Sequence, residues 1–172
     1  NPVVEGRKYA DFFSHIDLKD KNGMEKAARY YQDLYGLHGV FTAGTDFSTT
    51  VAYIAEKLDL PGISYKVACR ATNKSLMRKV FKIHSIPSPD FVTINPGDDQ
   101  SDITSGVLRH LSFPMVVKPV DNMGARGVRR VDSRNELLHA VNAARDASFS
   151  STVIIEEYME GPELSLDAIV YN

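Results

Sequence analysis

The first feature that could bind a ligand is a lysine at the end of an apolar run. It lies directly before a loop with two glycines and an arginine. The stretch is MVVKPVDNMGARGV, residues 115–128, and it contains Lys118, Gly124, Arg126 and Gly127. Glycine lets a backbone approach a ligand closely, and successive N–H groups in such a loop form an anion-binding concavity. An arginine adds a forked donor that suits phosphate oxygens. The stretch therefore predicts a binding site for the phosphates of a nucleotide.

Two plainer interpretations of the same residues remain open. Lys118 could be a strand-end lysine that reaches out to water along its aliphatic stem. The glycines could serve an ordinary β-hairpin turn. Neither interpretation needs a ligand.

A second stretch, VIIEEYMEGPELSLDA at residues 153–168, reads as a buried strand that ends in Glu156 and Glu157. The chain then breaks at a Gly-Pro pair and resumes as a strand that starts with Glu163. An extended connector of this kind exposes backbone N–H and C=O groups that can read an adenine edge, and Glu163 could accept hydrogen bonds from ribose hydroxyls. A charged surface hairpin is the alternative.

The other titratable residues give weaker signals. Lys74 and Arg78 share one face of a basic helix, which could equally be a solvated face. The five histidines show no metal-ligand spacing, and we expect them at the surface. The single cysteine, Cys69, reads as a small core residue. The sequence holds no GxxxxGK[ST], GxGxxG or GxSxG motif.

Composition excludes several classes of protein. The 172 residues carry a net charge of −2, with 43% hydrophobic and 24% charged residues, as in ordinary globular domains. That balance argues against a nucleic-acid or membrane-surface protein. One cysteine allows no internal disulfide and fits a reducing, cytoplasmic setting. No apolar run approaches the ~20 residues of a membrane span.

The first part of the chain alternates in the manner of a parallel α/β sheet. We expect strands at 9–18 and 39–44 and helices at 24–36 and 47–58, the second helix capped by Thr45 or Asp46. This pattern predicts a partial Rossmann-like domain over residues 1–66.

The second part, residues 67–172, has the pattern of an α+β fold. A basic helix runs from residue 71 and stops before Pro87. The remaining expected elements are strands at 91–94, 114–120, 126–131, 152–156 and 163–171 and helices at 98–111 and 136–147. Short connections between these elements favour an α+β layer over a doubly wound sheet.

These pieces, in this order, resemble the ATP-grasp superfamily, in its carbamoyl-phosphate-synthetase-like or carboxylate–amine ligase branch. The resemblance rests on NKSLMRKVFKIHSIPSP, FPMVVKPVDNMGARGV and VIIEEYMEGPELS, and it covers roughly residues 38–172. It implies a pre-ATP-grasp α/β domain followed by the first α+β part of an ATP-grasp domain.

The resemblance also implies roles for residues. Lys74 and Lys118 resemble the two lysines that hold ATP phosphates, and residues 121–128 resemble the mobile glycine loop. Glu156, with the backbone of Glu157 and Met159, is similar to the adenine-reading connector, and Glu163 to the ribose-binding acid. Thr45 and Asp46 lie where the preceding domain often helps to bind the acceptor substrate. The cofactors implied are ATP and Mg²⁺.

The magnesium ligands and the catalytic residues of that superfamily come later than Asn172. We therefore expect this chain to be part of a longer polypeptide, inactive alone, with no metal ligand of its own. The implied partners are small-molecule carboxylate and amine substrates, with no nucleic acid or membrane, and a homodimer stays open.

Three functions compete on sequence alone. The first is the ATP-binding portion of an ADP-forming ligase that activates a carboxylate as an acyl phosphate for attack by an amine. The second is an ATP-grasp carboxylase or a glycinamide-ribonucleotide-synthetase-like enzyme. The third is a non-enzymatic α/β binding module.

Overall fold

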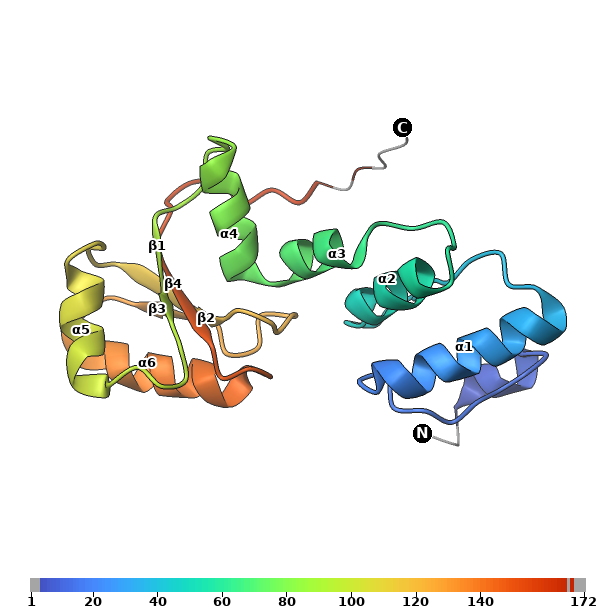
Figure 1. The fold of residues 1–172 in the computed structure, drawn as a ribbon. Coiled ribbons are helices and arrows are strands. Elements are labelled where there is room, and N and C mark those ends of the chain that lie inside the picture. Colours follow the sequence, from blue (N-terminus) through green and yellow to red (C-terminus); the bar gives the residue numbers. More distant parts are fainter. Residues whose placement is uncertain (1–3, 167, 169–172) are drawn as a thin grey trace. The chain divides into compact units, whose positions relative to one another are not determined.

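The computed structural model describes residues 4–166 and 168, and it divides the chain into two compact units, Asn1–Val80 and Phe81–Asn172. Figure 1 shows the helices of the first unit and the sheet of the second. In chain order the elements are η1 (Glu5–Tyr9), α1 (Lys21–Tyr35), α2 (Ser48–Lys57), α3 (Tyr65–Thr72), α4 (Lys74–Ile83), β1 (Phe91–Ile94), α5 (Gln100–Leu108), β2 (Met115–Pro119), β3 (Arg129–Val131), α6 (Arg134–Ala147) and β4 (Val153–Glu157). No helix among the described residues is long and apolar enough to cross a bilayer.

The first unit contains only helices and loops within residues 4–80, so the strands expected at 9–18 and 39–44 are wrong. A strand needs a hydrogen-bonded neighbour, and none is present there. One of the aromatic side chains that suggested the first strand, Phe12, packs on α1 instead. The ring of Phe12 stacks on Tyr35 with 4.2 Å between centroids and tilts against Tyr31 at 5.8 Å.

Helix ends in the first unit differ in detail from expectation. The helix α2 is formed as expected, but its N-cap residue is Phe47, and neither Thr45 nor Asp46 caps it. The basic helix expected from residue 71 begins at Lys74 as α4, and it follows a separate helix, α3, that was not expected. The Oδ1 atom of Asn73 accepts the backbone N–H three residues later at 3.0 Å, which starts α4 afresh.

The second unit is built on a four-stranded antiparallel sheet in the order β1-β4-β2-β3. The strands expected at 91–94, 114–120 and 152–156 are confirmed. The strand expected from residue 126 begins only at Arg129, because the glycine loop extends further than expected. Of the last expected strand, residues 163–166 form no strand, and most of the remainder lies outside the described residues.

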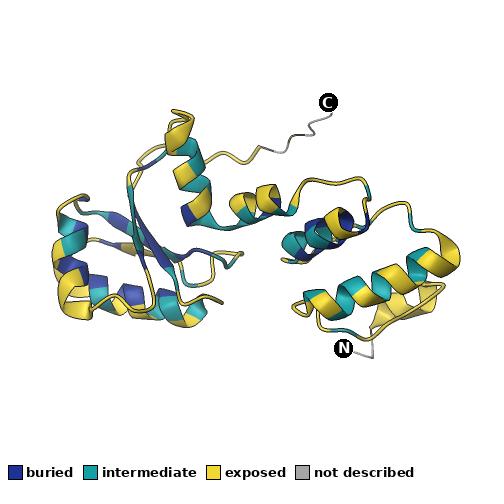
Figure 2. Cartoon of the chain, viewed as in Figure 1, coloured by how far each residue is buried: buried dark blue, intermediate teal, exposed yellow. Residues whose placement is uncertain are grey.

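The helices α5 and α6 pack on one face of this sheet and form the core of the second unit (Figures 1 and 2). Alternation along each strand directs one set of side chains into that core. The buried cluster includes Ile94, Ile103, Val107, Met115, Val117, Val131, Leu137, Val141, Ala144, Val153 and Ile155.

The other face of the sheet, here called the Lys118 face, carries the side chains of opposite parity. Strand register places these side chains together, because residues paired across an antiparallel ladder share a face. The Lys118 face comprises Phe91, Thr93, Val116, Lys118, Arg130, Ile154 and Glu156.

Candidate nucleotide-binding site

Lys118 and Glu156 form a buried ion pair on the Lys118 face. The Nζ atom of Lys118 donates to Oε2 of Glu156 at 2.6 Å, and the two side chains are 17% and 4% exposed. The register sets Lys118 opposite Ile154 and Glu156 opposite Val116, so the pair is diagonal across β2 and β4. The interpretation of Lys118 as a lysine that reaches out to water is therefore wrong.

Such a pair is costly for folding alone. The attraction between the two charges only partly offsets the free-energy cost of removing them from water. A pair of apolar side chains would stabilise the sheet equally well. The sheet nevertheless places a cation and a carboxylate at its centre. Lys118 has three N–H donors, and the bond to Glu156 uses one of them. This arrangement suits a ligand that carries both negative charge and a nucleobase with polar edge groups.

The loop between β2 and β3 is long and strained for a hairpin. It runs over residues 120–128, and its backbone has positive φ at Gly124 (64°), Ala125 (56°) and Gly127 (73°). Common hairpin connections have two to five residues. The plain hairpin-turn interpretation therefore does not explain this loop.

Asp121 anchors the start of the loop to the corner between α6 and β4. Its carboxylate accepts from Ser148 Oγ at 2.7 Å, from Phe149 N at 3.1 Å and from Ser150 N at 2.8 Å. Burial raises the pKa of Asp121, but these hydrogen bonds outweigh burial and hold the pKa below its ordinary value.

Replacing Asp121 with asparagine should lower the free energy of unfolding at pH 7 by about 1–2 kcal/mol, because bonds to a charged acceptor are lost at a partly exposed site. Since the folded pKa is depressed, this contribution is full above the unfolded pKa of about 3.9 and is lost as the pH falls through the folded value. Urea unfolding at pH 7 and near pH 3 measures the difference, with exposed Asp146→Asn as the control. An equal deficit at both pH values would contradict the assignment.

Arg126 folds back onto the base of the loop. Its Nε atom donates to Asn122 Oδ1 at 2.8 Å and to Met123 O at 3.0 Å. The Nδ2 atom of Asn122 donates to Ala147 O at 2.6 Å, which ties the loop to the end of α6. The loop tip is exposed, whereas its two ends are held.

The connector after β4 is pinned through two backbone N–H groups. Glu157 N donates to Asp90 O at 3.1 Å, and Tyr158 N donates to Pro114 O at 3.2 Å. Successive residues of an extended chain direct these groups to opposite sides. Met159 is 64% exposed, and Glu163 is also exposed. Lys118 lies in this sheet, the glycine loop joins its strands β2 and β3, and the connector follows its strand β4.

Lys74, Thr45 and Asp46 belong to the first unit. Lys74 is the first residue of α4, with Arg78 one turn later. Thr45 shares a hydrogen bond with Thr42 in the loop before α2. Their proposed roles at the site stay predictions.

The remaining titratable side chains add no second centre within the described residues. The five histidines are all exposed, and Cys69 is half-buried and not a core residue. No group of three or more His, Cys, Asp or Glu side chains gathers there in a way that could hold a metal ion.

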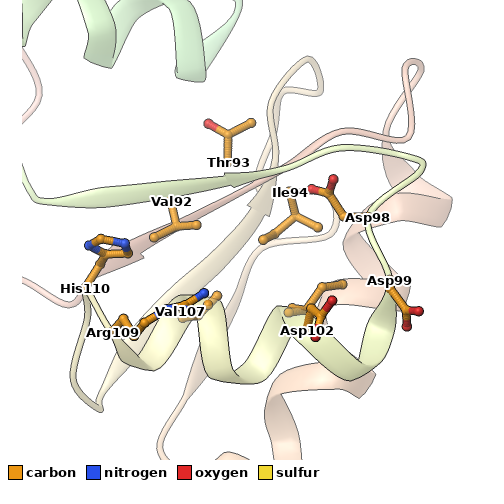
Figure 3. A pocket seen from close by; sticks show the side chains of 11 residues that line it. Val92, Thr93, Ile94, Asp98, Asp99, Asp102, Val107, Arg109 and His110 are labelled. Atoms are coloured by element: carbon orange, nitrogen blue, oxygen red, sulfur yellow. The ribbon is translucent and has the colours of Figure 1, made fainter.

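A pocket of about 340 Å³ lies between β1 and α5. In Figure 3, Val92 and Ile94 point toward α5 and Thr93 points away from it, so the pocket is on the helix side of the sheet. Two of its acidic side chains make local backbone contacts, since Asp98 accepts from Asn95 N at 2.7 Å and Asp99 caps α5. Apart from Thr93, none of the residues that line the pocket belongs to the Lys118 face.

A match to a protein-family model shows which family this chain belongs to. The model described as "D-ala D-ala ligase C-terminus" matches residues 80–171, more than half of the chain. The chain belongs to this family. The resemblance to the ATP-grasp superfamily is thereby confirmed.

Individual members and structural neighbours agree with the D-ala D-ala ligase C-terminus family. D-alanine–D-alanine ligase A of Bacillus cereus is 29% identical over 87% of this chain and 48% of its own length. An L-amino acid ligase structure from Bacillus licheniformis is 27% identical with a TM-score of 0.64, covering 84% of this chain and 32% of that one. A 2-oxoglutarate carboxylase biotin carboxylase domain from Hydrogenobacter thermophilus, in complex with MgADP and bicarbonate, shares the fold at 20% identity and TM-score 0.67, over 89% and 36%.

The chain spans less than half the length of the curated ligases it matches. Within the span shared with the family, sequence reasoning missed two side chains near the connector, Arg130 and Tyr158. The signal was available in part, because period-two alternation from Val131 puts Arg130 on the face opposite the core.

Proposed function

We propose that this chain supplies the adenine- and phosphate-binding side of the ATP site of an ADP-forming carboxylate–amine ligase. The observation that carries the proposal is the buried Lys118–Glu156 pair, which lies between the glycine loop and the connector on one sheet face. We divide the chain functionally into a pre-ATP-grasp part, residues 1–66, and an ATP-grasp part, residues 67–172.

Each group has a role that its chemistry allows. Lys118 and Lys74 neutralise phosphate charge, and Gly124, Arg126 and Gly127 let backbone N–H groups close over the phosphates. The C=O of Glu157 accepts from the exocyclic amine of adenine, and the N–H of Met159 donates to the neighbouring ring nitrogen. Glu156 orients Lys118 and faces the base, and Glu163 accepts from the ribose hydroxyls.

The reaction begins when a substrate carboxylate oxygen attacks the γ-phosphorus of ATP. The bond from γ-phosphorus to the bridging oxygen breaks, and an acyl phosphate and ADP form. An amine nitrogen then attacks the acyl carbon, phosphate leaves, and the amine loses a proton. Phosphoryl transfer asks the protein mainly for positioning and charge neutralisation, which these residues supply.

Magnesium normally accompanies ATP in such reactions. No carboxylate cluster among the described residues fits that ion, so we assign it no ligand in them.

We expect amino acids to be both substrates, because several similar proteins are named D-alanine–D-alanine ligase or L-amino acid ligase. The complete polypeptide that contains this chain should release ADP from ATP only when an amino acid is present. A coupled assay with a panel of D- and L-amino acids measures this dependence. ADP release that requires bicarbonate would instead support a carboxylase, and no ATP binding by calorimetry would refute the proposal.

A further inference from the structure

Arg130 is held over the ring of Tyr158. The guanidinium carbon of Arg130 lies 4.3 Å from the ring centroid, within the range of a cation–π contact. Asp132 orients the guanidinium, since Nε and an Nη of Arg130 each lie 2.8 Å from Asp132 Oδ1. The hydrogen bond that Arg130 donates to Asp132 raises the pKa of Arg130, so the cation is retained.

Tyr158 stands between the two connector residues that we assign to the nucleobase, Glu157 and Met159. Its backbone N–H is fixed on Pro114 O, and the preceding N–H on Asp90 O. Its side chain is fixed by Arg130, which reaches it from the far edge strand β3. The connector is thus held by backbone bonds to the residues directly before β1 and β2, and by a side-chain contact from β3.

We propose that Arg130 is a positioning residue for the nucleobase, which acts through Tyr158 to hold the Glu157–Met159 backbone ready to read adenine. This inference rests on the proposed function. A connector that is ordered before binding loses less conformational entropy when the base arrives. Arg130 therefore affects binding of the base and not the transfer of the phosphoryl group.

The size of the effect follows from the exposure of the contact. Arg130 is half exposed, and a cation–π contact at an exposed site changes an equilibrium by about two- to fivefold. Arg130→Gln should weaken binding of ATP and of adenosine by about that factor and narrow the preference for ATP over GTP. At saturating ATP, kcat should change little, so the loss appears in KM.

The experiment compares three variants of the complete polypeptide by calorimetry, kinetics and hydrogen exchange. Arg130→Gln removes the cation, and Arg130→Lys should restore most of the affinity because a cation remains over the ring. Arg129→Gln is the matched control, since Arg129 is exposed on the same strand but its side chain has the opposite parity. Amide exchange at Tyr158, whose N–H donates to Pro114 O, should accelerate in Arg130→Gln alone.

The outcomes separate the two proposals. If Arg130→Gln matches Arg129→Gln in adenosine affinity, or if it weakens tripolyphosphate binding but not adenosine binding, the positioning role is wrong. If the wild-type protein binds no ATP, the nucleotide site itself is refuted and the nucleobase role with it. Faster exchange at Tyr158 in that case would still show that Arg130 orders the connector.

Discussion

Replacing Lys118 with alanine should weaken ATP binding by about 10- to 100-fold, the range for a lost bond to a charged group. The same change should lower the free energy of unfolding by about 3 kcal/mol, because it leaves the carboxylate of Glu156, 4% exposed, without its cation. Calorimetry and urea unfolding on the complete polypeptide measure both quantities. We expect a larger loss of affinity than for alanine at any single histidine.

A second variant separates binding from stability. Lys118→Met combined with Glu156→Gln removes both charges, so most of the lost stability should return. Affinity for ATP should stay low, since neither the cation nor the carboxylate is present. Wild-type affinity in the double variant would show that the pair serves folding only.

Gly127→Ala should lower the free energy of unfolding by about 3 kcal/mol and weaken nucleotide binding as well. The backbone there has φ of 73°, which costs a residue with a side chain about 1–2 kcal/mol. The new Cβ would also lie 2.6 Å from the Cβ of Ala147, so the loop base or the end of α6 must shift, at about 1–3 kcal/mol. Thermal or urea unfolding measures the sum.

Two controls isolate the steric part of that effect. Gly124→Ala has the same kind of backbone, with φ of 64°, but nothing within 4 Å of the new Cβ, so it should cost only about 1–2 kcal/mol. Ala147→Gly in the Gly127→Ala background removes the clashing atom and should recover part of the loss. Equal costs at positions 124 and 127 would contradict the close approach of the loop to α6.

The second unit could be predicted well because its signals are local. Alternation of apolar residues in 114–120 and 152–156 marks strands that bury one face. The helices α5 and α6 cover that face and form the core with it. The first unit was harder. Aromatic richness in residues 9–18 is equally compatible with a strand and with packing on a helix, and only tertiary contacts such as Phe12 on Tyr35 decide.

Several residues of the proposed site can be picked out from the sequence one by one, but their arrangement cannot. Local sequence patterns point to Lys118 and to Glu156 separately. Their pairing depends on the register between β2 and β4, which no short-range signal encodes. The contact of Arg130 with Tyr158 also depends on that sheet order. The anchoring of Asp121 on the α6–β4 corner could not be foreseen because its donors are mostly backbone groups.

The most direct test is a structure of the complete polypeptide with a non-hydrolysable ATP analogue. The account predicts a triphosphate between Lys118 and residues 121–128, with the base against the backbone of Glu157 and Met159. An analogue bound in the pocket between β1 and α5, with the Lys118–Glu156 pair untouched, would contradict it.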